Sequence, residues 1–419
     1  MTDLRPVRGT HDWSPEETRQ FRHIVDMARI IAARYGFGEV MTPVFEYSEV
    51  FHRTLGDTSD IVSKETYTFD DRGGDSITLR PEITAALVRA FISNGWQNHD
   101  RWRYFYAGPA FRYERPQKGR MRQFHQLGVE WLGDDSVESD VQVIALARDL
   151  LHALGLGSVT TLELNSLGDR ESRAAYRETL VSYLQTYRND LSEDSQQRLE
   201  KNPLRILDSK DAGDRAILVD APKLIDAFNA TSRARVDALQ QLLQQLGISY
   251  QINPKLVRGL DYYQHCVFEF TTDKLGAQNA VIAGGRYDGL VQQMGGKQDV
   301  PGVGFAGGIE RLVALMREAG AWQEEAPHIV AVIGLGEGSA EACLPLVTSL
   351  RQAGHKVDYL TGNNMGKLMK KADKLGAKYA VVIGENERIN ARAQLRDLTR
   401  GEQQEMAMED IGKAIATWR

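Results

Sequence analysis

The sequence predicts an α+β protein in which strand-rich regions are interrupted by a helical module and followed by an α/β domain. Three observations support this prediction: alternating strand-like runs before residue 132, helical periodicity through residues 170–250, and apolar runs that alternate with helical segments near the C-terminus. A chain of 419 residues exceeds what one hydrophobic core usually supports. We therefore expect a first domain at 1–325, interrupted by 170–250, and a second domain at 326–419.

Composition is that of an ordinary globular protein, with 42% hydrophobic and 26% charged residues. No apolar stretch approaches the ~20 residues that span a bilayer, and the N-terminus lacks the apolar core of a secretory signal. We therefore expect a cytoplasmic protein with no membrane partner. Cys266 and Cys343 are far apart and have no CxxC companion, so they are expected to be packing residues and not metal ligands.

The first hundred residues predict helices around short strands. Thr18–Tyr35 has amphipathic helical spacing and leads into an expected strand at 39–46, where Pro43 suggests an edge or a bulge. Thr66–Leu79 predicts a hairpin with a glycine-containing turn. A helix should follow, with Glu82 near its amino end, where a carboxylate is favoured.

Arg103–Glu114 and Gln123–Leu132 predict two strands joined by a strongly basic loop. Strand alternation places Gln126 and Glu130 on one face, with Gly128 between them. Small residues between polar ones leave room for a ligand against a sheet. The alternative is a pair of solvent-facing polar rows.

The run Leu256–Phe270 combines a strand-like apolar pattern with an arginine, an aspartate and two tyrosines. Alternation places Arg258 and Tyr262 on one face, and Asp261 and Tyr263 on the other. This pattern is typical of the wall of a polar pocket. A half-buried strand whose Arg and Asp form a structural pair is the alternative.

Two basic features suggest contact with phosphate groups. Gly302–Leu315 is a glycine-rich strand end that runs into a helix with Arg311 in its first turn, although such turns often serve packing alone. Residues 327–419 hold 13 Lys and Arg against 11 Asp and Glu, a net +2, whereas the rest of the chain carries −8. Five lysines there follow helical spacing, which indicates either a phosphate-binding stripe or a solvated face: Lys367, Lys370, Lys371, Lys374 and Lys378.

Six motifs carry a resemblance to a known family: RGTHD, TLRPEITA, GPAFRYERPQKGRMRQFHQLGVE, LVRGLDYY, AGGRYDGL and GVGFAGGIERL. In this order and spacing they resemble bacterial-type histidyl-tRNA synthetases over essentially the whole chain. The resemblance implies an antiparallel class II catalytic sheet flanked by helices, an inserted helical domain and a C-terminal α/β anticodon-binding domain. It also implies a homodimer built partly on the first helix and the proline-bearing strand.

The implied reaction joins L-histidine and ATP, with Mg²⁺, to form histidyl-adenylate, and then transfers histidine to the 3′ end of its tRNA. No structural metal is implied. By motif position, Arg112 and Arg258 would be the catalytic cations on the α-phosphate, while Arg120 and Arg311 would hold the outer phosphates, so that these four arginines bind ATP.

The resemblance assigns histidine binding to Glu82, Thr84, Arg112, Gln126, Glu130, Tyr262 and Tyr263. Glu130 and Tyr263 would meet the two ring nitrogens, and Arg115 and Gln117 would read the acceptor end of the tRNA. The competing hypothesis is the regulatory paralogue that partners ATP phosphoribosyltransferase in histidine biosynthesis. That paralogue lacks the anticodon domain and typically loses the phosphate-binding arginines, all of which are present in this sequence.

Overall fold

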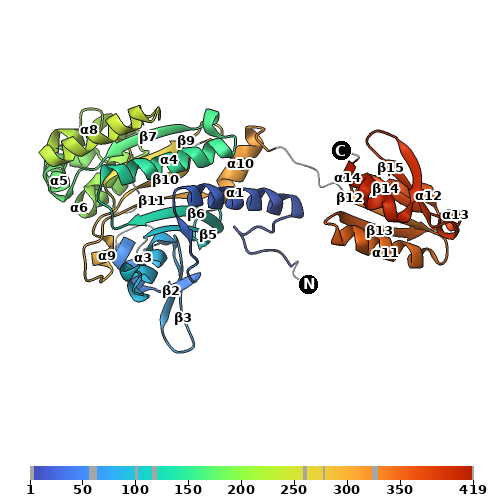
Figure 1. Ribbon diagram of the computed structural model, residues 1–419. Coiled ribbons are helices and arrows are strands. Elements are labelled where there is room, and N and C mark those ends of the chain that lie inside the picture. The colour runs from blue at the N-terminus through green and yellow to red at the C-terminus, as the bar shows by residue number, and fades with distance from the viewer. Residues whose placement is uncertain are drawn as a thin grey trace. The chain divides into compact units, whose positions relative to one another are not determined.

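The structure is a computed structural model (Figure 1). It describes residues 4–55, 64–99, 102–115, 120–257, 262–276, 279–322 and 329–417. The chain divides into two compact units, Met1–Trp322 and Gln323–Arg419, which are described separately.

An eight-stranded sheet forms the centre of the first unit, in the order β1-β5-β6-β11-β10-β9-β7-β8. Its strands are β1 (Gly38–Glu39), β5 (Arg103–Phe111), β6 (Gln123–Leu132), β11 (Gly302–Gly308), β10 (Ala280–Arg286), β9 (Gln264–Thr271), β7 (Thr161–Ser166) and β8 (Gln251–Ile252). The six central strands are antiparallel, which confirms the predicted type of sheet. The two end pairs, β1/β5 and β7/β8, are parallel. The outer strand of each end pair has only two residues, too short to produce a periodic signal in the sequence.

Helices cover both faces of this sheet (Figure 1). On one face lie α1 (Pro15–Arg34), α4 (Val137–Ala153) and α10 (Ile309–Glu318), and on the other lie α2 (Glu49–Leu55), α3 (Thr84–Ser93) and α9 (Leu290–Gln293). Odd-numbered residues of β6, such as Val129, pack against α1 and α4, so the predicted alternation of β6 is confirmed. Even-numbered residues of β6 therefore point to the other face.

Helix α1 begins at Pro15, before the predicted start at Thr18, because Ser14 caps it. Glu17 N donates to Ser14 Oγ at 3.3 Å, and Ser14 N donates to Glu17 Oε2 at 3.0 Å. This capping box satisfies backbone donors that the first turn leaves unpaired. The amphipathic spacing from which this helix was predicted concerns apolar residues only, so it does not indicate where a polar cap begins the helix.

The single strand predicted at 39–46 is wrong. The chain instead forms β1 and then β2 (Phe45–Tyr47), and these two strands belong to different sheets. Between these strands lies Pro43, which has no backbone N–H to donate to a neighbouring strand. Its carbonyl oxygen accepts a hydrogen bond from Nη1 of the buried Arg80 at 3.1 Å. The segment therefore bonds to a side chain at this point and not to a neighbouring strand.

The hairpin predicted at Thr66–Leu79 is confirmed by β3 (Tyr67–Asp70) and β4 (Ser76–Leu79), which pair antiparallel. Asp71 Oδ1 accepts from the backbone N–H of Gly73 at 2.7 Å and from that of Asp75 at 3.0 Å, which closes the turn. The hairpin forms a three-stranded sheet with β2, in the order β2-β4-β3.

The helical segment predicted between β7 and β8 is confirmed as helical. It contains α5 (Arg170–Gln185), α6 (Glu193–Lys201), α7 (Ala212–Ile217) and α8 (Ala230–Gln245). Leu239 and Leu243 of α8 pack into the same core as α1 and α4, while Tyr176 and Leu180 of α5 pack into the core on the other face of the sheet. The treatment of 170–250 as a domain of its own stays a prediction.

The second unit contains a five-stranded sheet in the order β13-β12-β14-β15-β16. Its elements are β12 (Ile329–Leu335), α11 (Ser339–Gln352), β13 (Lys356–Gly362), α12 (Met365–Lys374), β14 (Ala377–Ile383), α13 (Glu385–Ile389), β15 (Arg392–Asp397), β16 (Gln403–Ala407) and α14 (Ile411–Thr417). The first three strands in this order pair in parallel and the last two in antiparallel fashion, so the predicted α/β alternation is confirmed. Cys343 and, in the first unit, Cys266 are buried thiols without a disulfide, as expected of packing residues.

The lysine stripe is shorter than predicted. Helix α12 ends at Lys374, and Gly376 follows with a φ of +69°, a left-handed conformation that favours glycine and stops the helix. Lys378 therefore lies on β14 and does not extend the helical face. Within the described ranges, no helix has the length and apolar character needed to cross a membrane.

Candidate active site

A small buried pocket lies against the face of the central sheet formed by the even-numbered residues of β6 and β11. Its volume is about 160 Å³, well below that of a cavity for a drug-sized ligand and suited to a molecule the size of an amino acid. All seven residues expected to bind histidine line it: Glu82, Thr84, Arg112, Gln126, Glu130, Tyr262 and Tyr263. The fold thus brings together side chains from β6, the start of α3 and the segment before β9.

Glu130 is the most enclosed acidic group of this pocket, with 1% of its surface exposed. Its Oε1 accepts from Thr84 Oγ1 at 2.6 Å and from Tyr106 OH at 3.0 Å, and its Oε2 accepts from Tyr287 OH at 2.5 Å. Burial raises the pKa of Glu130 to about 8, although the three hydroxyl groups act in the opposite direction. The carboxyl group is therefore held by neutral donors and can gain or lose a proton near neutral pH.

Tyr106 and Tyr287 are site residues that the sequence did not reveal. Both are buried, as expected of core tyrosines, and only their hydroxyl groups identify them as partners of Glu130. The alternation of side chains along a strand could have revealed Tyr106, because it places this residue on the same face of β5 as Gly108 and Ala110. Tyr106 also pairs across the sheet with Gly128. A Cβ added to Gly128 would lie 2.4 Å from the hydroxyl oxygen of Tyr106. The gap predicted beside Gly128 is therefore filled by a protein side chain and not left for a ligand.

Glu82 and Gln126 form the second polar wall. Glu82 caps α3, since its carboxylate accepts from the backbone N–H of Thr84 at 2.9 Å and from that of Ala85 at 2.7 Å, which confirms its predicted place at a helix amino end. Burial raises the pKa of Glu82, and the Ala85 hydrogen bond opposes this shift. Gln126 Oε1 is buried and has no hydrogen-bond partner among the described residues. An acceptor in this position calls for a donor from a bound molecule.

Three of the four arginines expected at phosphate groups lie near one another beside this pocket: Arg112, Arg120 and Arg311. Glu114 Oε2 lies 3.0 Å from Arg120 Nε, and Glu114 Oε1 lies 3.9 Å from Arg112 Nη1. Burial lowers the pKa of Arg311, and the neighbouring positive charges of Arg120 and Arg112 act in the same direction. Three arginines around the carboxylate of Glu114 leave an excess of positive charge, which favours a further anion at this place.

Four residues singled out from the sequence are not part of this geometry. Arg258 and Gln117 lie outside the described residues, as does Asp261. Arg115 is described and its side chain is exposed, at the start of the basic loop.

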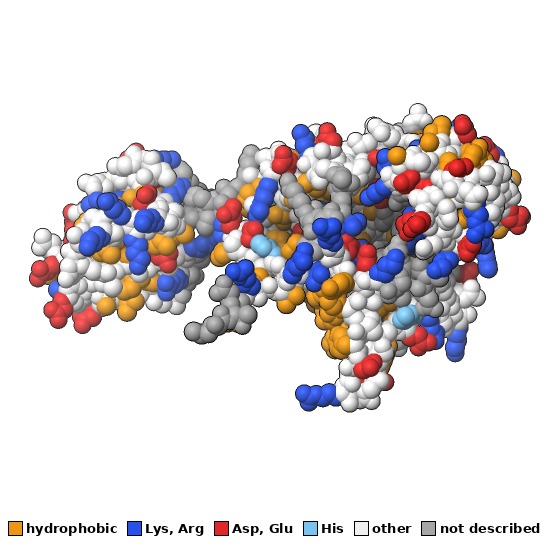
Figure 2. All heavy atoms as spheres, turned by 180° about the vertical axis from the view of Figure 1, so that it is seen from behind, with side chains coloured by type: hydrophobic (Ala, Val, Ile, Leu, Met, Phe, Trp, Pro, Cys, Tyr) orange, Lys and Arg blue, Asp and Glu red, His pale blue; other side chains and the backbone are white. Residues whose placement is uncertain are grey.

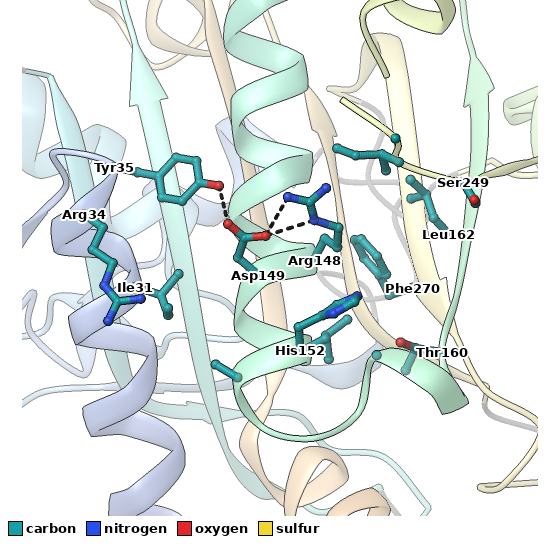
Figure 3. Close-up of a pocket in the computed structure, with 15 residues that line it drawn as sticks. Ile31, Arg34, Tyr35, Arg148, Asp149, His152, Thr160, Leu162, Ser249 and Phe270 are labelled. Carbon is teal, nitrogen blue, oxygen red and sulfur yellow. Dashed lines mark hydrogen bonds and ion pairs between the residues drawn. The ribbon is translucent and has the colours of Figure 1, made fainter. Parts of the chain in front are cut away.

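A larger cavity of about 600 Å³ lies on the opposite face of the sheet, around the end of α4 (Figure 3). There Asp149 Oδ2 accepts from Tyr35 OH at 2.6 Å, and Asp149 Oδ1 accepts from Arg148 Nη2 at 2.7 Å. Two of its charged residues, Arg148 and Asp149, thus pair with each other, and none of the site residues predicted from the sequence lines it. The smaller pocket, with its buried carboxylates and unpaired acceptor, is the better candidate for a site of chemistry.

Glu130→Gln should stabilise the ligand-free protein at alkaline pH. The pKa of Glu130 is about 8 in the folded chain, against an ordinary value of 4.5 that it regains on unfolding. Between these two pKa values, folding takes up a proton. The free energy of unfolding of the wild type therefore falls as pH rises from the lower value to the higher one, by up to roughly 1.4 kcal/mol per pH unit. We expect the variant to melt above wild type at about pH 8.5, with a difference that shrinks toward about pH 5. A difference independent of pH would contradict this assignment.

Comparisons with known proteins agree with the geometry. The sequence profile described as histidyl-tRNA synthetase matches residues 9–312, and one described as an anticodon binding domain matches 329–418. The chain is 55% identical to a protein named histidine–tRNA ligase from Rhodospirillum rubrum, over 99% of this chain and 98% of that protein. A protein of the same name from Gluconobacter oxydans is 49% identical over the full length of both chains. The crystal structure of apo S. aureus histidyl-tRNA synthetase is similar with a TM-score of 0.83 and 33% identity, covering 98% of this chain and 99% of that one. The chain therefore belongs to the histidyl-tRNA synthetase family.

Proposed function

We propose that this chain is a histidine–tRNA ligase whose amino-acid site is the pocket around Glu130. The carboxylate of L-histidine attacks the α-phosphate of ATP, pyrophosphate leaves, and a hydroxyl group of the terminal ribose of the tRNA then attacks the histidyl carbonyl and releases AMP. The observation that carries the proposal is the buried Glu130 carboxylate, whose hydrogen-bond partners among the described residues are three hydroxyl groups, in a cavity of about 160 Å³.

Counted over the described residues, the ionised Glu130 carboxylate has room for one more hydrogen bond. An ionised carboxylate offers about four acceptor positions, and three are taken by Thr84, Tyr106 and Tyr287. A ring N–H of histidine would take the fourth, and Tyr263 would meet the other ring nitrogen. Phenylalanine offers neither polar atom, so its binding would leave buried groups unpaired, which is how such a site rejects a near-isostere.

The histidine ammonium group would bind at the opposite wall. Its N–H groups match the unpaired Oε1 of Gln126, with Glu82 supplying negative charge and Thr84 a further oxygen. Arg112 lines the same cavity and would lie between the histidine carboxylate and the α-phosphate. Amino acid and nucleotide would thus be aligned for attack by fixed side chains.

Stabilisation of phosphate charge would fall to the arginines. Arg112 and Arg258 would neutralise charge that develops at the α-phosphate, and Arg120 and Arg311 would hold the outer phosphates. Among the described residues, no group of three or more His, Cys, Asp or Glu side chains is placed to hold a metal ion. Mg²⁺ that accompanies ATP takes most of its ligands from phosphate oxygens and water.

The regulatory paralogue of ATP phosphoribosyltransferase is the weaker alternative. It would lack the unit that matches the anticodon binding domain, and it would lose the phosphate-binding arginines. Residues 329–418 match that domain, and Arg112, Arg120 and Arg311 lie together beside the pocket. These features favour a working ligase that acts on tRNA in the cytoplasm.

A homodimer is supported by an apolar surface next to the hairpin of β3 and β4. Met41 is 82% exposed and Tyr47 is 61% exposed, and Phe45 and Phe69 are also exposed. Figure 2 shows hydrophobic side chains gathered beside this projecting hairpin. Exposed apolar surface of this kind often marks a site of protein–protein contact, and we propose that a second copy of the chain covers it.

Arg258→Ala should abolish adenylate formation and leave histidine binding within a few-fold. Loss of one fixed positive charge at a developing anion lowers the rate by roughly 10²- to 10³-fold. Histidine-dependent ATP–pyrophosphate exchange measures the first effect, and calorimetric titration with histidine measures the second. Near wild-type exchange by the variant would remove Arg258 from the phosphate site.

A chain that ends at Glu325 should form adenylate but charge tRNA poorly, because the pocket and its arginines lie before that residue and the more basic segment follows it. Exchange and aminoacylation measured side by side on the truncated and full-length proteins test this. Equal charging by the two proteins would show that the second unit does not serve tRNA binding.

By the family resemblance, Arg115 would read the extra 5′ guanosine at the acceptor end of histidine tRNA. Arg115→Ala should therefore selectively lower charging of tRNA that carries this guanosine. A bidentate contact from arginine to a base edge is worth about 1 to 3 kcal/mol of discrimination, so we expect a loss of roughly 10- to 100-fold on this tRNA and little change on tRNA without it. Adenylate formation should be preserved. A uniform loss on both tRNAs would instead indicate phosphate attraction alone, shared with Arg120 and Arg122 nearby.

A further inference from the structure

Helix α5 contacts the main chain of the amino-acid pocket directly. Arg173 Nη1 donates to the carbonyl oxygen of Tyr263 at 2.7 Å, across 90 positions of sequence. Tyr263 is itself buried and lines the pocket. A hydrogen bond from a charged group to a partly buried carbonyl is short and strong, so it constrains the backbone that carries the tyrosine ring.

The segment that follows Tyr263 is held by bonds to two other parts of the fold. Gln264 Nε2 donates to the carbonyl of Asp288 at 2.7 Å, and His265 N donates to the carbonyl of Gly168 at 2.8 Å. His265 has a φ of +46°, a left-handed conformation that is uncommon for residues other than glycine. The start of β9 and the residue before it therefore depend on contacts with other segments for their conformation. The contact made by Arg173 comes from the helical segment.

A second chain of contacts links the same helical segment to the other side of the pocket. Arg235 of α8 donates to Asp140 at 3.3 Å, and the fully buried Arg286 donates to Asp140 at 2.8 Å. The residue after Arg286 is Tyr287, whose hydroxyl group donates to Glu130 at 2.5 Å. Both walls that would meet the imidazole ring are thus reached from residues 170–250.

We propose that Arg173 is a positioning residue for histidine binding, through which helix α5 fixes the main chain of Tyr263. The inference rests on the proposed function of the pocket as the histidine site. Arg173 does not reach the cavity around Glu130; it lines a neighbouring cavity of about 540 Å³ together with Arg177 and Tyr262. Its effect is therefore exerted through Tyr263 and falls on the amino acid, not on ATP.

The test compares full-length wild type with Arg173→Ala, Arg173→Lys and Arg177→Ala in histidine-dependent pyrophosphate exchange. Loss of a hydrogen bond from a charged donor should raise the KM for histidine by about tenfold or more in Arg173→Ala, with the KM for ATP within about twofold. Lysine can donate to the same carbonyl oxygen, so Arg173→Lys should recover part of the loss. Arg177→Ala removes an exposed charge from the same helix and cavity and should match wild type.

An unchanged KM for histidine in a folded Arg173→Ala protein would overturn the inference. So would an equal rise in both KM values, because that result indicates general damage and not placement of Tyr263. Calorimetric titration with histidine separates this inference from the proposed function. A wild-type protein that binds histidine without exchange would contradict the ligase activity alone, and a weaker titration of Arg173→Ala would still support the role of Arg173. A wild-type protein that does not bind histidine would contradict both.

Discussion

Burial of the Glu130 carboxylate is the constraint on which the pocket depends. An ionised carboxylate removed from water is strongly destabilising unless hydrogen-bond donors replace the solvent. The fold supplies three donors from three places in the chain: Thr84 at the start of α3, Tyr106 on β5 and Tyr287 after β10. These elements must lie in register on one face of the sheet. An added Cβ at Gly304 would come within 1.9 Å of Glu130 Oε2, so the neighbouring strand must carry glycine there.

Burial of Glu130 lowers the stability of the folded protein but provides a group that can recognise the ligand. The raised pKa of Glu130 means that burial is only partly offset by the three hydroxyl groups. A nonpolar residue in place of Glu130 would remove the free-energy cost of burying a carboxylate, but it could not pair with a ring nitrogen. Sites that select a ligand by its polar atoms often hold such incompletely compensated groups. Gln126 Oε1 is a second such group, because it is buried and has no hydrogen-bond donor within the part of the chain that the structure describes.

Local sequence patterns predicted much of the fold and only part of the site. Strand alternation placed Gln126 and Glu130 on one face of β6 because a period of two is a local property. The hydroxyl groups of Tyr106 and Tyr287 were missed, since a tyrosine in a strand pattern indicates core packing and its partner lies far away in sequence. The strand predicted at 39–46 was wrong for a similar reason: β1 and β2 pair with different distant strands. The roles of Arg258 and Gln117 stay predictions from family resemblance.

The central claim is that the pocket around Glu130 selects L-histidine for activation by ATP. ATP–pyrophosphate exchange by the purified full-length protein, measured separately with each of the standard amino acids, tests it most directly. The account predicts exchange with L-histidine alone. Exchange driven by phenylalanine, glutamine or another amino acid at a comparable rate, or no exchange by a folded protein with histidine and MgATP, would contradict it.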